Sequence, residues 1–317
     1  MPRCSVILVT YNSSAQIEAC LRALAPQDCE IIVVDNASED DTVARVRTLA
    51  EEVSLQLLTI SRNLGFAGGV NQGVRAASGD VLLILNPDAV AEKGAIDAIL
   101  ACFTTSGASA VGGALLESDG QSAKGFVFRR IPTLTSLLFD VLLVNQAWPG
   151  NPVNRRYRCL DADYCKQQQV EQPAGACLAV TREAWDSVQG MDPGFFPVWF
   201  EDVDLCKRLL VQRASILYCP GARFHHSGAH SVAQLKFRDK QMFWYENMVR
   251  FAGKHLSGRS VFFLRLGIFV GMGLRSLASL FGGGPKNLPP GEPIRSYARV
   301  ATWAIGLGRI AADERAK

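Results

Sequence analysis

Two apolar stretches near the start of the chain, "CSVILVTYN" (Cys4–Asn12) and "EIIVVDNASED" (Glu30–Asp40), decide the fold. Each has the pattern of a buried strand that runs into polar turn residues. Between them, Ile17, Leu21 and Leu24 recur at helical spacing. Two buried strands joined by a helix within about thirty residues make a βαβ unit, and such a unit builds a parallel sheet.

The same alternation of strand and helix continues along the chain. Strands are predicted at "SLQLLTI" (Ser54–Ile60) and "DVLLILNPD" (Asp80–Asp88), with the short helix "GGVNQGVRAAS" (residues 68–78) between them. "PAGACLAVTREAWDSV" (Pro173–Val188) predicts a strand and then a helix, and another helix should begin near Glu201. We therefore expect an open, mostly parallel α/β sheet flanked by helices, with ligands beyond the carboxyl ends of its strands.

The composition limits the class of protein. A chain of 317 residues is long enough for one large domain with an appendage or for two modest domains. Its nine cysteines include no CxxC pair, which argues against a zinc ribbon or a disulfide framework and favours the reducing cytoplasm. No basic leader precedes the first apolar segment, so we expect no signal peptide.

The charge is unevenly distributed. Residues 1–204 contain 15 Lys and Arg against 25 Asp and Glu, whereas residues 205–310 contain 16 against 3. The basic C-terminal third therefore predicts an anionic surface or ligand as its partner.

Two carboxylates end predicted strands and should lie at one edge of the sheet, namely Asp35 and Asp88. Asp35 could accept hydrogen bonds from a nucleobase or ribose, or it could cap the following helix, and the two roles are compatible. Asn86-Pro87-Asp88 could be a simple turn, because all three residue types form turns. It could also supply the hard oxygen ligands that Mg²⁺ or Mn²⁺ uses when it binds a diphosphate.

Histidines and glycines supply further candidates. His226 could be another ligand of that cation; a zinc site of His225, His226 and His230 is disfavoured, because no Cys or Glu stands at the required spacing. "RNLGFAGGVNQG" (Arg62–Gly73) is neither a dinucleotide fingerprint nor a P-loop. Its glycines could let backbone N–H groups approach a phosphate beside Arg62, or they could simply permit a tight strand-to-helix turn.

A third acidic group opens a predicted helix, in "WFEDVDLCKR" (Trp199–Arg208). Complementation of the helix dipole explains one or two of its carboxylates. It does not explain why they follow the aromatic run "DPGFFPVWF", which would screen them from water. Adjacent, partly desolvated carboxylates repel each other and raise the pKa of at least one of them, which suits a general base.

Seven motifs occur in an order that resembles glycosyltransferase family 2. They are "VILVTYN", "VVDNAS", "RNLGFAGGVNQG", "LILNPDA", "GACLAVTREAW", "GMDPGFFPVWFEDVDLCKR" and "HHSGAHS". Within the family, the likeness is to the rhamnosyltransferase-like branch, which often has NPD where relatives have DxD. The resemblance covers residues 4 to about 231 and leaves out the basic tail.

The family resemblance implies an A-type glycosyltransferase fold and a domain plan. The catalytic domain would span 1–235, with a nucleotide-sugar half at about 1–110 and an acceptor half at about 111–235. A basic helical extension would follow at 236–317.

The resemblance also implies roles for individual residues. Asp202 would be the catalytic base, with Glu201 beside it. Asp88 would bind the Mg²⁺ or Mn²⁺ ion, completed by His226 as in some relatives, although Asn86 in place of a carboxylate weakens such a site. The implied donor-binding residues are Thr10, Asn12, Asp35, Asn36, Arg62, Gly65, Asn71, Asn86 and Asp88. The implied acceptor-side residues are Gly175, Ala176 and Trp199.

The resemblance implies an inverting glycosyltransferase that uses a nucleotide-diphospho-sugar. The expected donor is a dTDP- or UDP-sugar, with rhamnose as the preferred sugar, and the acceptor is a hydroxyl of a glycan or polyprenyl-diphosphate-linked molecule in cell-surface polysaccharide synthesis. We expect no nucleic-acid partner, and a homo-oligomer is compatible with the sequence.

Two other classes of protein compete with this interpretation. One is a catalytically silent nucleotide-sugar-binding or scaffold protein on the same fold, which need not keep Asp35, Asp88, Asp202 and His226. The other is a dinucleotide-dependent oxidoreductase. It is disfavoured because "TYNSSAQ" follows the first strand where GxGxxG would stand.

The most apolar stretch is "SVFFLRLGIFVGMGLRSLASLF" (Ser260–Phe281). A membrane-spanning helix needs about 20 mostly apolar residues. Arg265 and Arg275 interrupt the stretch, and each would cost about 2.5–3.5 kcal/mol near a membrane centre. We therefore expect a helix that lies on the cytoplasmic face of the plasma membrane, in the headgroup layer, with both arginines in water. Alternatively, these helices pack on the catalytic domain or on a second subunit.

Overall fold

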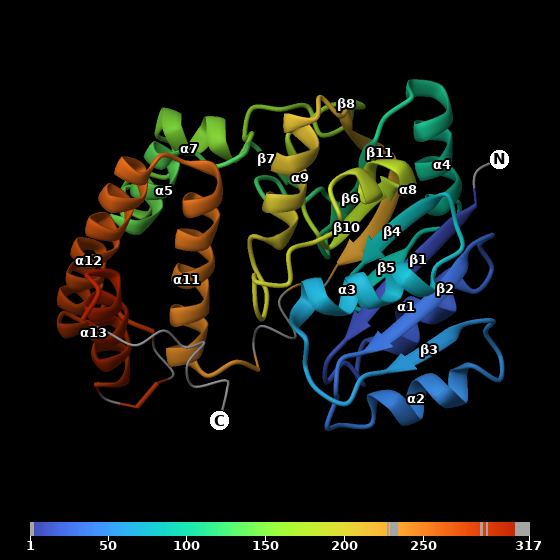
Figure 1. The fold of residues 1–317 in the computed structure, drawn as a ribbon, viewed down its shortest axis with the longest axis horizontal. Helices are drawn as coiled ribbons and strands as arrows, with labels where there is room; N and C mark the ends of the chain where they lie inside the picture. Colours follow the sequence, from blue (N-terminus) through green and yellow to red (C-terminus); the bar gives the residue numbers. More distant parts are fainter. Residues whose placement is uncertain (1–2, 227, 229–233, 286–287, 290, 308–317) are drawn as a thin grey trace. The chain divides into compact units, whose positions relative to one another are not determined.

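The computed structural model describes residues 3–226, 228, 234–285, 288–289 and 291–307. The chain forms two compact units (Figure 1). Unit 1 contains residues 1–131 and 158–231, and unit 2 contains residues 132–157 and 232–317.

Unit 1 is built on a mixed sheet, which in the described part of the chain has nine strands. The order across the sheet is β3 (Gln56–Thr59), β2 (Glu30–Asp35), β1 (Cys4–Thr10), β4 (Val81–Leu85), β10 (Cys177–Thr181), β6 (Ala110–Leu116), β11 (Ile216–His226) and β5 (Ala89–Ala91), and β8 (Gln168–Gln169) pairs with β11. The first four strands are parallel, β10 is antiparallel to β4 and β6, and β6 is parallel to β11. This confirms the open, mostly parallel sheet predicted from the apolar segments.

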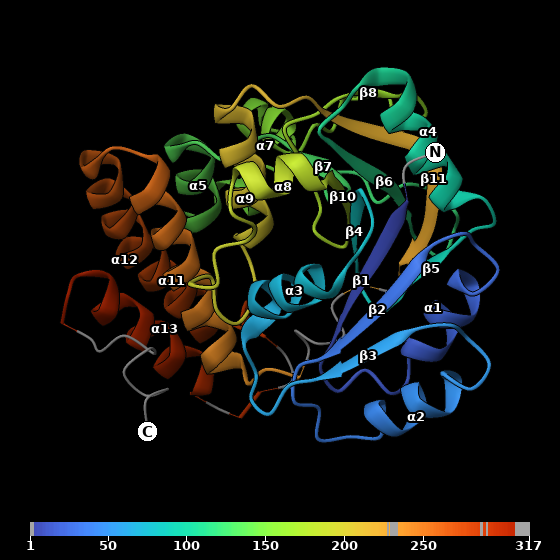
Figure 2. The ribbon, with the colours of Figure 1, turned by 45° about the vertical axis from the view of Figure 1, so that its right-hand side comes forward.

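Helices cover both faces of this sheet because alternate side chains of each strand point to opposite faces. In β1, Val6 and Leu8 belong to one core cluster and Ile7 and Val9 to the other. The first cluster packs under α1 (Ile17–Leu24), α2 (Thr42–Leu49) and α4 (Ala95–Ser106). The second packs under α3 (Gly65–Ala76), α8 (Arg182–Ser187) and α9 (Glu201–Val211) (Figure 2). A small second sheet pairs β7 (Phe128–Arg129) with β9 (Gln172–Pro173).

Two glycines of the predicted glycine-rich motif serve helix packing. A Cβ atom on Gly69 would lie 2.6 Å from Val9 Cγ1, and one on Gly73 would lie 2.5 Å from Ile7 Cγ2. Both distances are shorter than any stable carbon–carbon contact, so only glycine lets α3 approach β1 this closely. Close helix–sheet packing therefore accounts for part of the motif.

Unit 2 is helical. It contains α5 (Leu134–Val141), α6 (Val144–Ala147), α7 (Pro152–Tyr157), α11 (Phe237–His255), α12 (Gly258–Leu280) and α13 (Glu292–Ala304). The sequence prediction had assigned residues 132–157 to the acceptor half of the catalytic domain, but here they join the C-terminal helices. The reason is local packing: a Cβ on Gly267 of α12 would lie 2.5 Å from Leu138 Cδ2 of α5.

The prediction that the two arginines of α12 lie in water is wrong. Arg265 donates hydrogen bonds to the carbonyl oxygens of Ala304 (2.8 Å) and Trp303 (3.1 Å). Arg275 donates to the carbonyl oxygens of Asp140 and Val141. Both side chains are partly buried within unit 2, because the partly negative carbonyl ends of α5 and α13 attract a guanidinium.

Candidate active site

The carboxyl ends of β1 and β2 hold Asp35 in a fixed position. Parallel pairing sets Thr10 opposite Asp35, and the Thr10 hydroxyl donates to Asp35 Oδ1 at 3.1 Å. The backbone N–H of Ser38 donates to Asp35 Oδ2 at 3.0 Å, and the residue is 2% exposed. Asp35 does not cap the next helix, since α2 begins at Thr42 with Asp41 at the cap position. The capping alternative is therefore wrong, and the carboxylate stays at the sheet edge.

Asn36 ties this edge to the start of α3. Its Oδ1 accepts the backbone N–H of Leu64 at 2.8 Å, and its Nδ2 donates to Asn63 Oδ1 (2.9 Å) and to the carbonyl of Gly65 (3.1 Å). The Asn36 side chain thus positions the loop that carries Arg62, whose own side chain is exposed.

Asn12 acts in a similar way after β1. Its backbone N–H donates to Ser38 Oγ at 2.9 Å, and its Oδ1 accepts the backbone N–H of Glu39 at 2.8 Å. These bonds fasten the turn after β1 to the turn after β2.

Gly65 brings the start of α3 against the loop before α9. Its φ is +74°, and a Cβ there would lie 2.9 Å from Phe196 Cδ2 and 3.0 Å from the carbonyl oxygen of Pro197. The neighbouring Phe66 N–H donates to that same oxygen at 2.7 Å. Gly65 is therefore needed for its backbone conformation and for the close approach, and through Pro197 it braces the loop that carries Trp199.

Asp88 and His226 meet because of strand register. β5 pairs with β11 so that Ala89 lies opposite His226, which brings the preceding Asp88 alongside the imidazole. Both side chains are 7% exposed, and His226 Nε2 lies 3.4 Å from Asp88 Oδ1. That separation exceeds a well-formed hydrogen bond, and Nε2 is buried with no hydrogen-bond partner among the described residues.

This pair fits a divalent cation. A buried imidazole nitrogen without a partner is costly unless a ligand satisfies it, and here it faces a carboxylate oxygen. Burial acts to raise the pKa of Asp88, but the His226 imidazole and nearby N–H groups outweigh it, so the pKa lies below its ordinary value. Asp88 is therefore ionised, as a metal ligand must be. A magnesium-type site completes its coordination with water and substrate phosphates, so two protein ligands suffice.

A three-histidine zinc site is not supported. His225 is about half exposed and its Nε2 lies 3.0 Å from Glu92 Oε1, away from the buried pair. His230 lies outside the described residues. Within the described part of the chain, no group of three His, Cys, Asp or Glu residues could hold a metal.

Asp202 lies in the first turn of α9, where three N–H donors converge on its carboxylate. Oδ2 accepts from Gly175 N (2.9 Å) and Gln172 Nε2 (3.0 Å), and Oδ1 accepts from Val203 N (2.8 Å). A Cβ on Gly175 would lie 3.0 Å from the Cβ of Asp202, so a larger residue would crowd this side chain. Asp202 as a whole is only partly buried.

Glu201 and Asp202 have unlike environments. Burial and the neighbouring Asp202 raise the pKa of Glu201 well above its ordinary value, and Glu201 Oε2 has no hydrogen-bond partner among the described residues. Burial also raises the pKa of Asp202, while the N–H groups of Gly175 and Val203 and the charge of Arg129 offset part of that rise. Asp202 is therefore the carboxylate that can be ionised and still accept a proton.

A short chain of backbone contacts joins the two acidic centres. The N–H of Asn86 donates to the carbonyl of Ala176 at 3.0 Å, and the preceding Gly175 donates to Asp202. The segment Gly175–Ala176 thus lies between the Asn86-Pro87-Asp88 turn and the start of α9. The arrangement places a candidate metal ligand, Asp88, and a candidate base, Asp202, on either side of one dipeptide.

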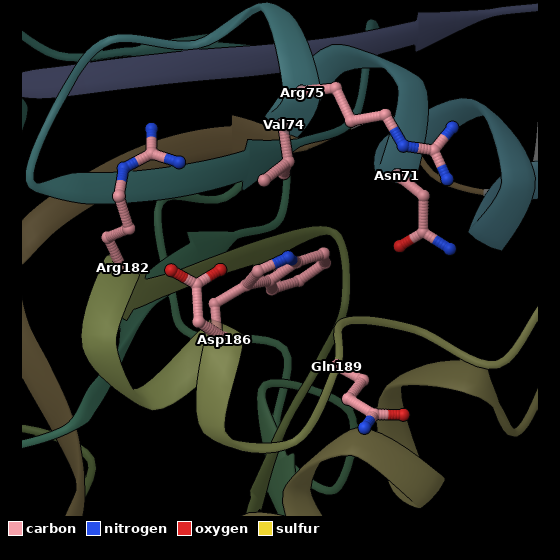
Figure 3. A pocket seen from close by; sticks show the side chains of 7 residues that line it. Asn71, Val74, Arg75, Arg182, Asp186 and Gln189 are labelled. Atoms are coloured by element: carbon pink, nitrogen blue, oxygen red, sulfur yellow. The ribbon is translucent and has the colours of Figure 1, made fainter.

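Asn71 lies elsewhere. Its side-chain amide donates to the carbonyl of Met191 (2.8 Å) and accepts the Met191 N–H (3.1 Å). It also lines a pocket of about 310 Å³ between α3 and α8, together with Arg75, Arg182 and Asp186 (Figure 3). Arg182 donates to the carbonyls of residues 77 and 79, just before β4, whereas Asp88 follows β4. The pocket and the carboxylate pair therefore belong to opposite ends of that strand.

Residues 5–157 match the family model described as glycosyl transferase family 2. This part of the chain belongs to that family. Among its relatives is the N-acetylglucosaminyl-diphospho-decaprenol L-rhamnosyltransferase of Mycobacterium tuberculosis, 29% identical over 244 residues, which span 72% of this chain and 77% of the relative. Another is the GalNAc(5)-diNAcBac-PP-undecaprenol beta-1,3-glucosyltransferase of Campylobacter jejuni, 30% identical over 40% of this chain and 42% of the relative.

Solved structures agree with the family 2 fold. The mannosyltransferase PcManGT of Pyrobaculum calidifontis, solved with GDP-Man and Mn²⁺, superposes with a TM-score of 0.54. It is 16% identical, and the match covers 99% of this chain and 87% of that one. The likeness establishes the A-type glycosyltransferase fold, and the family establishes a glycosyltransferase.

Sequence reasoning missed three side chains that shape the family 2 site. Gln172 donates to Asp202, and the positive charge of Arg129 offsets part of the rise in the pKa of Asp202 that burial causes. Phe126 stacks on His226 with ring centroids 5.7 Å apart. All three lie in or beside the small β7–β9 sheet, outside every quoted motif. Only the arginine carried a visible signal, as a cation within an acidic half of the chain.

Proposed function

We propose that this protein is an inverting glycosyltransferase that moves a sugar from a nucleotide-diphospho-sugar to a hydroxyl group. One observation carries the proposal, namely that Asp88 and Asp202 flank the dipeptide Gly175–Ala176. The Asn86 N–H donates to the Ala176 carbonyl on one side, and the Gly175 N–H donates to Asp202 on the other. A site that transfers a sugar needs a place for the leaving diphosphate and a base for the attacking hydroxyl, and these two carboxylates divide those tasks.

The donor's nucleotide would lie over the carboxyl ends of β1 and β2. Asp35, held by Thr10 and Ser38, would accept hydrogen bonds from the base or ribose. Asn12 and Asn36 fix the turns around it, and the exposed Arg62 would add positive charge near the diphosphate.

Asp88 and His226 would hold Mg²⁺ or Mn²⁺. When bound, the ion would neutralise negative charge on the departing diphosphate. The Mn²⁺ in the structure of the mannosyltransferase PcManGT supports this proposal. The orphan nitrogen of His226 supports it independently.

Asp202 would take the proton of the acceptor hydroxyl. As the hydroxyl oxygen bonds to the anomeric carbon, the bond from that carbon to the diphosphate oxygen breaks, and nucleoside diphosphate leaves with the electron pair. Because a single displacement occurs from the face opposite the leaving group, the anomeric configuration inverts. Trp199, on the loop before α9, would contact the acceptor.

We further propose a dTDP- or UDP-sugar donor, with dTDP-rhamnose preferred, and a polyprenyl-diphosphate-linked glycan acceptor in cell-surface polysaccharide synthesis. The names of the mycobacterial and Campylobacter relatives support both parts, since each names a polyprenyl carrier and one names rhamnose. Work on such an acceptor would place the enzyme peripherally at the cytoplasmic face of the plasma membrane.

A panel of nucleotide sugars tests the proposal. Thermal shift and release of nucleoside diphosphate are measured with and without Mn²⁺, in the presence of a polyprenyl-diphosphate-linked N-acetylglucosamine acceptor. We expect dTDP-rhamnose or a UDP-sugar to be turned over, and Asp202→Asn to bind the donor without turning it over. Preference for GDP- or CMP-sugars would refute the donor assignment, and an absence of any turnover would favour a silent binding protein.

A further inference from the structure

The helix α12 exposes a continuous apolar surface. Six of its side chains, each 39–63% exposed, form what we call the apolar stripe: Phe262, Leu266, Phe269, Val270, Leu274 and Leu277. Their spacing of three or four residues places them on one side of the helix. From Phe262 to Leu277, the stripe runs about 22 Å at the helical rise per residue. No charged residue interrupts it, because Arg265 and Arg275 bond to carbonyls on other sides of the helix.

The opposite side of α12 is packed inside unit 2. Leu264, Ile268 and Met272 are fully buried. A Cβ on Gly271 would lie 2.0 Å from the carbonyl oxygen of Val141, so α5 approaches the helix backbone directly. The helix therefore has two distinct sides, one satisfied by protein and one in contact with solvent.

This packing argues against a helix that crosses a membrane. By length and composition alone, α12 could span one, with 23 residues and a mean hydropathy of 1.6. However, α13 packs on it through Arg265 and carries Glu292, Arg295 and Arg299. A transmembrane α12 would carry these charges into hydrocarbon or lose the packing, and both are unfavourable.

The charge of unit 2 indicates what covers the stripe. Its sequence contains sixteen Lys and Arg against six Asp and Glu. Arg259, one turn before Phe262, is exposed on the same side of α12, and Arg250 and Lys254 are exposed on α11. A second copy on this stripe would bring like charges together. An anionic bilayer offers both a hydrocarbon layer for the stripe and phosphates for the cations.

We propose that the apolar stripe of α12 inserts into the boundary between headgroups and acyl chains of an anionic lipid bilayer, with the helix axis in the membrane plane. The proposal goes beyond sugar transfer, and the only part of the proposed function on which it rests is the peripheral location named above. It assigns the membrane contact to one helix side and makes the protein monotopic.

Vesicle flotation with the full-length protein tests the proposal without any need for enzymatic activity. The vesicles are phosphatidylcholine with or without phosphatidylglycerol. The test variant is Leu266→Gln with Phe269→Gln, which removes apolar surface without changing charge. The matched control is Val211→Gln, an apolar residue 69% exposed on α9 of unit 1. Thermal melts confirm that each variant is folded.

The wild type and Val211→Gln should float with phosphatidylglycerol vesicles. The partition coefficient of the double variant onto these vesicles should be lower by a factor of about ten or more. Several results would overturn the proposal. These are a wild type that does not float, a double variant that floats like the wild type, and a protein that alkaline carbonate fails to extract. A dimer in light scattering that the double substitution dissociates, without vesicle binding, would assign the stripe to a second copy instead.

Discussion

Replacing Asp202 by asparagine tests the assignment of the base at atomic detail. The wild-type carboxylate accepts three N–H donors, from Gln172, Gly175 and Val203, on two oxygens. Asparagine keeps the shape but offers one accepting oxygen. Its NH₂ group must then face either Val203 N–H or the pair of donors at Oδ2. Two N–H groups that face each other cannot bond, so at least one donor loses its partner whichever way the amide turns.

The expected magnitudes follow from this geometry. Loss of a general base lowers turnover by about 10²–10⁴. An unpaired donor in a partly buried site lowers the free energy of unfolding by about 1–3 kcal/mol. Donor binding should change little, because the proposed site of the donor's diphosphate is at Asp88 and not at Asp202. The variant must therefore be assayed well below its melting temperature, so that lost activity is not lost fold.

Glu201→Gln is the matched control for Asp202→Asn, since it removes the adjacent carboxylate in an isosteric way. We expect nearly full activity from it. Initial rates of nucleoside diphosphate release, measured for both variants at saturating donor, provide the comparison. The assignment fails if Glu201→Gln is the crippling change and Asp202→Asn is mild.

The pH dependence of the rate tests the assignment of Asp202 as the base in a second way. Burial raises the pKa of Asp202, and a base acts only when ionised, so the rate should fall as the pH falls through a value above the ordinary aspartate pKa. Gln172→Ala removes a donor to the ionised form. The pKa should then rise further, and the acid limb of the rate profile should move to higher pH. An unmoved limb would mean that another group sets it.

Glu201 should also make stability depend on pH. Its folded pKa is raised by burial and by Asp202, so the folded protein binds its proton more tightly than the unfolded chain does. The stability that the protonated Glu201 contributes is therefore lost as the pH rises above about 4.3, the ordinary carboxyl value, toward the raised pKa. The melting temperature of Glu201→Gln relative to wild type should increase with pH over that window; a pH-independent difference would contradict the assignment.

Two further predictions concern the Asp88–His226 pair and the start of α3. Chelation by EDTA should abolish activity, and Asp88→Ala and His226→Ala should each raise the Mn²⁺ concentration needed for half-maximal rate, whereas the exposed His225→Ala should not; full activity in EDTA would remove the metal from the mechanism. Gly65→Ala should lower the free energy of unfolding by more than Gly94→Ala, which has a similar positive φ but open space around it. The φ strain alone costs about 1–2 kcal/mol, so equal losses in chemical denaturation would show that the contact with Phe196 is unimportant.

The sequence predicted the sheet well because its signals are local. Strands β1, β2 and β4 are mostly apolar runs, and each ends at or directly before a polar residue that marks the sheet edge. Helix α9 begins at Glu201, as predicted. The division into units was harder to predict. Residues 132–157 join unit 2 through contacts such as Gly267 with Leu138, and no local pattern in either segment announces a pairing so distant along the chain.

The residues of the candidate site also differ in whether the sequence could predict them. Asp35, Asp88 and Asp202 could be predicted because each follows an apolar run or opens a helix. The donors around Asp202 could not, since Gln172 reaches it from a two-stranded sheet thirty residues away in sequence. Asn71 was predicted to bind the donor, yet its amide is bonded to Met191. A motif shows which residues recur together, and it does not separate those that hold loops from those that touch a ligand.

The anomeric configuration of the product tests the central claim most directly. A proton NMR time course would follow the transfer of rhamnose from dTDP-rhamnose to a polyprenyl-diphosphate-linked N-acetylglucosamine in the presence of Mn²⁺. The account predicts that the sugar appears on the acceptor with the configuration opposite to that in the donor, and that Asp202→Asn suppresses this product. Transfer with retained configuration, or transfer that survives the loss of Asp202, would contradict a single displacement with Asp202 as its base.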